Sequence, residues 1–334
     1  MRARGVAGSL KYWQHVKKTR TPPCPSRAVP TRMMMPFAAT FLGMCVVLAA
    51  MYLLVLPRRG LVPAQGCEWR FERYEPSAWE ANWTAGVAGL QADVCARTDS
   101  AAAAAWVERL DDAVLSHFYF VNSCSGERLV QRVEPLAGLT RHPYFCLRGP
   151  EYVVDKAYLV PAAALVSAST GRFFYFDFGA SVFDGGEGGS SQQWVVQRYA
   201  GVVWDGIWAW EAKEHPPADV WRRIPKRLHP VYHWYNILAL YSDPVVFINA
   251  VADVSDYVVL KIDIDNSAVE TAMVRRLLQS PDTLARVDEL YFEHHVDVEP
   301  MWPYWGRVPG TELADTYRLF AELRHRGVVA HSWV

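Results

Sequence analysis

The sequence predicts an α/β fold with a doubly wound, mostly parallel sheet, preceded by a transmembrane helix and a small cysteine-containing region. Three observations lead to this prediction. Short apolar runs alternate with helical stretches after Pro150, polar residues gather where the apolar runs end, and one uncharged run near the N-terminus is long enough to cross a bilayer. Ligands of such sheets bind outside the carboxyl ends of the strands, so we expect a site there.

The uncharged run is 37-FAATFLGMCVVLAAMYLLVL-56. Twenty residues at about 1.5 Å each make a helix of about 30 Å, the thickness of the hydrocarbon core of a bilayer. Eight Lys/Arg residues precede it in a tail, residues 1–36, and only two follow in a stem, residues 57–66. The positive-inside rule predicts a single-pass type II membrane protein of the endomembrane system (Golgi or endoplasmic reticulum) with a cytosolic tail and a luminal body. An organelle transit peptide is the alternative.

Charge is unevenly distributed along the chain. Residues 1–67 hold ten Lys/Arg and no Asp/Glu, which leaves 24 basic and 35 acidic residues, a formal net charge of −11, in the remainder. Because nucleic-acid phosphates need a basic face, this acidic body excludes nucleic acid as its partner. A glycosylation sequon at Asn82-Trp83-Thr84 agrees with a luminal location.

The cysteine-containing region, residues 67–150, holds four cysteines. An oxidising lumen would pair them, and the shortest loops favour Cys67 with Cys95 and Cys124 with Cys146, whereas reduced, buried thiols are the alternative. The clearest element of the region is a helix over residues 100–120, where an alanine run follows a capping residue.

The C-terminal domain, residues 151–334, is expected to contain six strands and three helices. Short apolar or aromatic runs indicate the strands, and apolar residues at helical spacing, with a serine start or a glycine stop, indicate the helices. The predicted strands are 172–181, 202–211, 245–252, 256–265, 288–295 and 328–334, and the predicted helices are 190–201, 267–279 and 311–327.

Polar residues follow the first two predicted strands. In 177-DFGAS-181 the glycine allows a sharp turn close to a ligand, and Glu211 at the end of the next strand can accept both hydroxyls of a ribose. The glycine-rich loop 182–193 carries two acidic residues, so it suits phosphate poorly. This favours a cofactor with a positive sulfonium and no phosphate over NAD or a sugar nucleotide.

Four motifs in this order resemble the FkbM-like branch of the S-adenosylmethionine-dependent methyltransferases, over about residues 170–334. They are 175-YFDFGAS-181, the strand ending in Glu211, 260-LKIDIDNSAVE-270 and 289-ELYFEHH-295. The resemblance implies a Rossmann-like methyltransferase fold with S-adenosylmethionine as cofactor, its methionine part in the first motif and its ribose on the acid after the second strand. The expected cofactor-binding residues are Asp177, Gly179, Ala180, Ser181, Glu211 and Asp263.

The motif of the fourth strand departs from the family pattern of lysine, x, aspartate, x, glutamate, glycine. Here it contains Lys261, Asp263, Asp265 and Asn266. The second acid keeps its charge with a shorter reach, and asparagine can keep a left-handed backbone. The aspartate pair also has the D-x-D spacing of metal-dependent glycosyltransferases. That alternative leaves Glu211 without a role and only about 70 residues after the motif.

The expected reaction is methyl transfer to a hydroxyl, with a glycan as the acceptor class. Asp265, His294 and His295 are the candidates for orienting or deprotonating that hydroxyl, because a histidine near a carboxylate can act as a general base. The same set could ligate a divalent metal, but no metal is assigned. The aromatic stretches 221–236 and 301–306 either contact the acceptor or pack in the core. A non-catalytic luminal binding module with this fold is the last alternative.

Overall fold

The computed structural model describes residues 67–87, 91, 93–95, 114–135, 149, 154–185 and 190–333. These residues belong to one compact unit, Gln65–Val334. The predicted tail, transmembrane segment and stem lie outside the described residues. Within the described ranges, no helix is long and apolar enough to cross a membrane.

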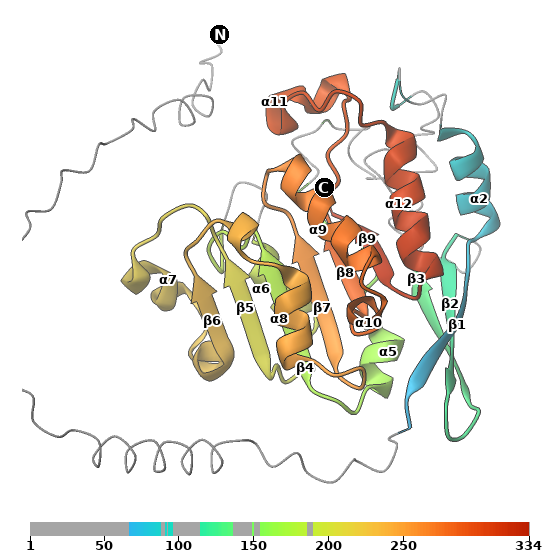
Figure 1. Cartoon of the computed structure of the whole chain (residues 1–334), viewed down its shortest axis with the longest axis horizontal. Coiled ribbons are helices and arrows are strands. Elements are labelled where there is room, and N and C mark those ends of the chain that lie inside the picture. The colour runs from blue at the N-terminus through green and yellow to red at the C-terminus, as the bar shows by residue number, and fades with distance from the viewer. Residues whose placement is uncertain are drawn as a thin grey trace, which may run out of the picture. The chain divides into compact units, whose positions relative to one another are not determined.

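Six parallel strands form the main sheet, in the order β6-β5-β4-β7-β8-β9 (Figure 1). Counted along the chain this is the order 3-2-1-4-5-6 of doubly wound nucleotide-binding sheets, which reverses between β4 and β7. The predicted α/β fold with a parallel sheet is therefore confirmed. The strands are β4 (Phe173–Phe178), β5 (Gly206–Trp210), β6 (Tyr232–Tyr235), β7 (Tyr257–Ile262), β8 (Glu289–Phe292) and β9 (Val329–Ser332).

Helices cover both faces of this sheet (Figure 1). One core cluster joins the sheet to α8 (Pro244–Val251), α9 (Ser267–Leu278) and α12 (Leu313–His325). A second cluster joins the opposite face to α5 (Ala163–Ala168), α6 (Ser191–Arg198) and α7 (Pro217–Arg223). Shorter helical segments are η4 (Lys226–Val231), η5 (Ala239–Tyr241), α10 (Pro281–Leu284), η6 (Glu299–Met301) and α11 (Trp302–Trp305).

Because both faces are covered, the residues of β4, β5, β7 and β8 are buried apart from Phe173 at the start of β4, and aromatic rings stack across neighbouring strands. The Phe178 ring of β4 stacks on Trp210 of β5 with centroids 4.2 Å apart, and Trp210 stacks on Tyr235 of β6 at 5.2 Å. These three residues are the last of their strands, so the stacked rings pack the carboxyl ends of β4, β5 and β6 against one another.

The cysteine-containing region supplies a second, antiparallel sheet of β1 (Trp69–Glu75), β2 (Ser116–Asn122) and β3 (Arg128–Val133), and the helix α2 (Ala78–Ala85). Buried Arg324 of α12 ties this region to the main sheet. Its guanidinium donates to the Tyr74 hydroxyl at 3.0 Å and the Glu134 carbonyl at 3.0 Å, and lies 3.4 Å from the Glu80 carboxylate. The sequon residue Asn82 is exposed on α2.

The prediction of a strand over residues 245–252 is wrong, because this stretch forms helix α8. The Asp243 side chain caps the helix by accepting a hydrogen bond from the Val245 amide at 3.0 Å, and Pro244 occupies the first helical position, where a missing N–H costs nothing. Consequently, Ala250–Ala252 does not lie at the carboxyl edge of the sheet. The third strand of the main sheet, counted along the chain, is instead β6, which lies within the aromatic stretch 221–236.

Two predictions in the cysteine-containing region are also corrected. Residues 116–120 of the predicted helix belong to β2, whereas residues 100–113 lie outside the described residues. Cys67 is bonded to Cys124, not to Cys95, and Cys95 takes part in a different disulfide. Both predicted pairings are therefore wrong. Pairing by shortest loop failed because β1 and β2 are antiparallel neighbours, which brings residues 57 positions apart together.

Candidate functional site

The predicted cofactor-binding residues lie at the carboxyl ends of β4, β5 and β7, where the strand order reverses. After β4 the chain turns at Gly179, whose φ is +89°, and the amides of Gly179 and Ala180 donate to the Trp210 carbonyl of β5 at 3.0 and 2.9 Å. A Cβ on Gly179 would lie 1.5 Å from the Asp263 carbonyl oxygen. Glycine is therefore required here by the approach of the chain leaving β7.

A buried ion-pair chain joins β4 to β7. The Lys261 ammonium lies 3.2 Å from Asp177 Oδ1 and 2.9 Å from Asp263 Oδ2, and it donates to the Gly179 carbonyl at 3.0 Å. Burial opposes the charge on Lys261, but the two carboxylates outweigh it and raise the lysine pKa. Burial also opposes the charge on Asp177 and therefore raises the pKa of this carboxyl group. Lys261 thus serves as the counter-ion of both predicted cofactor-binding aspartates.

The Glu211 carboxylate accepts two backbone hydrogen bonds, one of them from the loop that follows β4. Its Oε2 accepts a hydrogen bond from the Ser181 amide at 2.7 Å, and its Oε1 accepts one from the Lys213 amide at 2.6 Å. Ser181 itself has a left-handed φ of +51°. Each carboxylate oxygen has a second lone pair, so Glu211 keeps acceptor capacity for a ligand hydroxyl.

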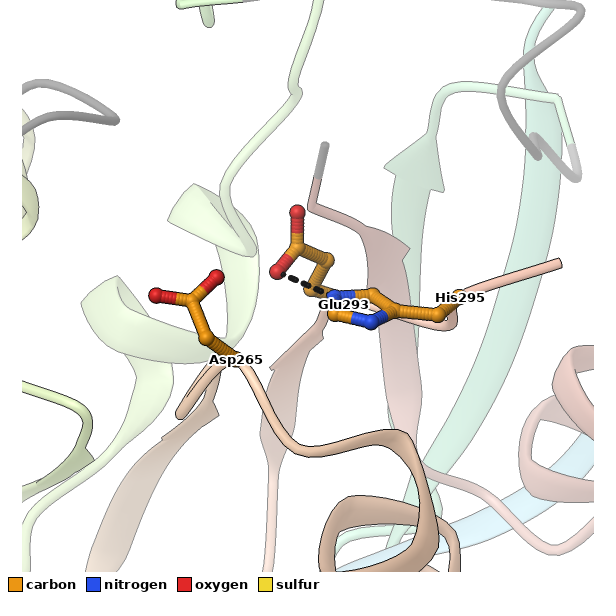
Figure 2. Close-up of side chains that lie close together, drawn as sticks. All are labelled: Asp265, Glu293 and His295. Atoms are coloured by element: carbon orange, nitrogen blue, oxygen red, sulfur yellow. Dashed lines mark hydrogen bonds and ion pairs between the residues drawn. The ribbon is translucent and has the colours of Figure 1, made fainter. Parts of the chain in front are cut away.

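A second group of side chains, called here the β7–β8 cluster, lies beside this ion-pair chain. Ligand atoms of Asp265, Glu293 and His295 all lie within 4.8 Å of one another, and so do those of Asp263, Glu270 and Glu293. Figure 2 shows that the Asp265 carboxylate points toward the Glu293–His295 pair, whose Oε2 and Nε2 atoms are 2.8 Å apart. The members of the cluster are Asp263, Asp265, Glu270, Glu293 and His295.

Protonation in the β7–β8 cluster is set by burial and by mutual repulsion. Burial and Asp263 raise the pKa of Glu293 to about 7, and burial raises that of Glu270 to about 8. For His295 burial opposes the charged form, but Glu293 outweighs it and raises the pKa to about 9. Asp263 is the exception, because Lys261 overcomes burial and lowers its pKa to about 2. At neutral pH the Glu293–His295 pair therefore shares a proton.

His294 and Asn266 lie differently from the expectation. The His294 ring bonds Thr316 Oγ1 of α12 at 2.7 Å, so it faces that helix and does not belong to the β7–β8 cluster. Burial lowers its pKa to about 4. The left-handed residue after β7 is Asp265, with φ +55°, whereas Asn266 caps α9 by accepting from the Val269 amide. The D-x-D carboxylates are thus separated by a turn.

A cavity of about 210 Å³ adjoins the ion-pair chain, with Lys156, Ser191, Trp194 and Trp333 among its walls. Ser191 donates to Asp177 Oδ2 at 3.2 Å, and the Trp333 indole donates to Asp263 Oδ2 at 3.0 Å. Burial lowers the pKa of Lys156 to about 8, with Asp263 acting in the opposite direction. The cavity therefore combines a cation, hydroxyls and two indoles.

Several residues of this site were not identified as site residues from the sequence. The sequence contains an indication for Lys261, because a lysine inside a strand of apolar residues needs a buried partner of opposite charge. It contains none for Glu270. Trp305 was expected, within the stretch 301–306, to contact the acceptor or to pack in the core, and it donates to Glu293 Oε1 at 2.9 Å and stacks on His295. Lys156 is distant in sequence from every motif. Comparisons with family models, curated proteins and solved structures found no match to this chain.

Proposed function

We propose that this chain is an S-adenosylmethionine-dependent O-methyltransferase whose cofactor binds at the carboxyl ends of β4, β5 and β7. The observation that carries the proposal is the hydrogen bond between the Ser181 amide and Glu211 at the reversal of strand order. It puts the predicted methionine loop and the predicted ribose acceptor side by side, at the place where doubly wound sheets bind nucleosides.

The electrostatics of this edge also favour such a cofactor. Asp177 is neutralised by Lys261, so Glu211 is the acidic side chain that the neighbouring ends of β4 and β5 offer to a ligand. A sulfonium ion is stabilised by oxygen atoms, whereas a diphosphate needs amide or cationic donors. The described loop after β5, residues 211–216, contains one lysine, Lys213, and this side chain is exposed.

The acceptor hydroxyl is assigned to the side of the β7–β8 cluster. Its oxygen attacks the methyl carbon, the carbon–sulfur bond breaks, and the sulfonium becomes the thioether of S-adenosylhomocysteine. The hydroxyl proton passes to the Glu293–His295 pair, with Asp265 orienting the hydroxyl. Of the two histidines expected to do this, the proposal keeps His295, because His294 bonds Thr316. Trp305 beside the pair is suited to stacking on a sugar ring, which keeps a glycan as the proposed acceptor.

The glycosyltransferase alternative finds less support in the same geometry. A D-x-D pair must offer both carboxylates to one metal ion, but Asp263 already bonds Lys261 and the Trp333 indole. Asp265 belongs to the β7–β8 cluster with Glu293 and His295 instead. The proposed location, a luminal domain on a type II membrane anchor, rests on the sequence of residues 1–66.

Calorimetric titration of the full-length protein with S-adenosylmethionine tests the proposal. We expect micromolar binding that weakens at least tenfold in Glu211→Gln, which keeps the shape of the side chain but removes its charge. Glu214→Gln is the matched control, since Glu214 is an exposed glutamate three residues away. No binding to a protein with a cooperative melting transition, or equal loss in both variants, would overturn the cofactor site. Titration with a sugar nucleotide and Mn²⁺ then tests the alternative.

A further inference from the structure

The β7–β8 cluster brings four carboxyl groups close to one imidazole. The Lys261 ammonium pairs with Asp177 and Asp263. One oxygen of buried Glu270 accepts from the Ile264 amide at 2.8 Å, but Oε2 has no hydrogen-bond partner in the described part of the chain. A buried carboxyl oxygen without a hydrogen-bond partner destabilises the fold, so its presence requires an explanation.

The geometry matches the coordination sphere of one metal ion. Two ligand atoms bonded to the same cation at about 2.1 Å are at most about 4.2 Å apart. The ligand atoms of Asp265, Glu293 and His295 already lie within 4.8 Å of one another, so a shift of a few tenths of an ångström per side chain would close the set. Asp265 is exposed, which provides a route of entry for an ion.

We propose that Asp265, Glu293 and His295 bind a divalent first-row transition-metal cation, with the unpartnered Glu270 carboxyl beside them in the same cluster. One imidazole with carboxylates suits Mn²⁺ or Zn²⁺ better than Mg²⁺ or Ca²⁺, which prefer oxygen ligands alone. The Glu293–His295 hydrogen bond is the metal-free arrangement, in which a proton joins the two atoms that would otherwise coordinate the ion (Figure 2).

Neighbouring side chains and backbone orient the three proposed ligands. Trp305 holds Glu293 Oε1 through its indole N–H and stacks on the His295 ring with centroids 4.9 Å apart. Ligand orientation by such outer contacts is a general feature of metal centres. Asp265 is held by the left-handed turn after β7, which points its carboxylate toward the pair (Figure 2).

The cation site stands independently of methyl transfer. Its consequence for the reaction, by contrast, rests on the proposed function. A cation at this place would bind the acceptor hydroxyl and lower the pKa of that hydroxyl. With the ion bound, Asp265 and His295 would act as its ligands in place of the roles given to them in the metal-free reaction above, and the hydroxyl proton would leave to solvent.

Electron paramagnetic resonance of Mn²⁺ tests the site directly, because the six-line signal of the free ion diminishes on binding. The full-length protein is first treated with a chelator and then titrated with MnCl₂, without S-adenosylmethionine. We expect one bound ion per chain and displacement by Zn²⁺. Affinity should fall at least tenfold in Asp265→Asn, which changes an exposed side chain and so preserves the fold, and in His295→Gln.

Two controls make the result specific. Asp282→Asn removes an exposed carboxylate outside the cluster, and His294→Gln removes the neighbouring imidazole, which bonds Thr316. Both should bind Mn²⁺ like the unaltered protein. Absence of Mn²⁺ and Zn²⁺ binding, or unchanged affinity in Asp265→Asn and His295→Gln, would overturn the proposal. Cation binding without S-adenosylmethionine binding would support this site and reject the proposed methyltransferase. Binding of S-adenosylmethionine without cation binding would reject this site and leave the methyltransferase proposal standing.

Discussion

Gly179 and Asp263 approach so closely that a Cβ on the glycine would lie 1.5 Å from the aspartate carbonyl oxygen. The turn after β4 and the turn after β7 therefore support each other at the reversal of strand order. This contact explains the glycine by packing between two strand ends, in addition to any approach of a ligand to its backbone.

Gly179→Ala should destabilise the protein by about 3 kcal/mol or more, because the clash is with backbone and the φ of +89° is strained for alanine. Chemical denaturation measures the change. Gly201→Ala is the matched control, since nothing lies within 4 Å of its Cβ position and its φ is not left-handed. A change within about 1 kcal/mol is expected there. Equal effects of the two substitutions would contradict the packing argument.

Lys261→Met should destabilise the protein by about 3–5 kcal/mol, because it leaves Asp177 and Asp263 without their shared counter-ion in a buried setting. The midpoint of urea unfolding measures the loss. Adding Asp177→Asn should recover part of it by removing one uncompensated charge, and a double-mutant cycle gives the coupling. If Lys261→Met unfolds like the unaltered protein, the ion-pair chain does not stabilise the fold.

Stability should fall as the pH rises from about 6.5 to about 9, through His331. This buried ring bonds Glu134 at 2.8 Å and Glu289 at 3.3 Å, and although burial opposes its charge, these carboxylates raise its pKa to about 9. A raised histidine pKa stabilises the folded state below the unfolded pKa and loses that effect as pH approaches the folded one.

Through this one proton, the free energy of unfolding changes by at most about 1.4 kcal/mol per pH unit. Thermal melts of the unaltered protein and of His331→Gln over this pH range measure it. His331→Gln should be less stable at pH 6 and should show a flatter profile. A profile as steep as that of the unaltered protein would show that another group titrates.

The Cys67–Cys124 disulfide should stabilise the fold by about 4 kcal/mol in the chain-entropy model, because it closes a separation of 57 residues. Peptide mapping without reduction should find Cys67 joined to Cys124, and a Cys67–Cys95 peptide would contradict the structure. Replacing both cysteines by serine should lower the unfolding midpoint. An unchanged midpoint would show that β1 and β2 stay paired through hydrogen bonds and packing alone.

The sequence pattern was enough to predict an element wherever a single local property determines the structure of that segment. Five of the six predicted strands lie at the expected places, because an apolar run before a polar end specifies a buried parallel strand with its end at the edge of the sheet. The grouping of Asp177, Glu211 and Asp263 followed from that rule. The prediction over residues 245–252 failed because the run was judged by its apolar residues and not by the Asp243-Pro244 start.

Contacts between distant segments could not be obtained in this way, since each depends on how elements pack after they form. The disulfide pairing depends on the register of β1 and β2, and burial of Arg324 depends on α12 lying against the first sheet. Which of His294 and His295 joins the carboxylates depends on which side of the chain leaving β8 each ring occupies. Periodicity and composition thus specify the strands and the edge that holds the site, whereas the pairing of charges across that edge arises only when the whole sheet excludes water.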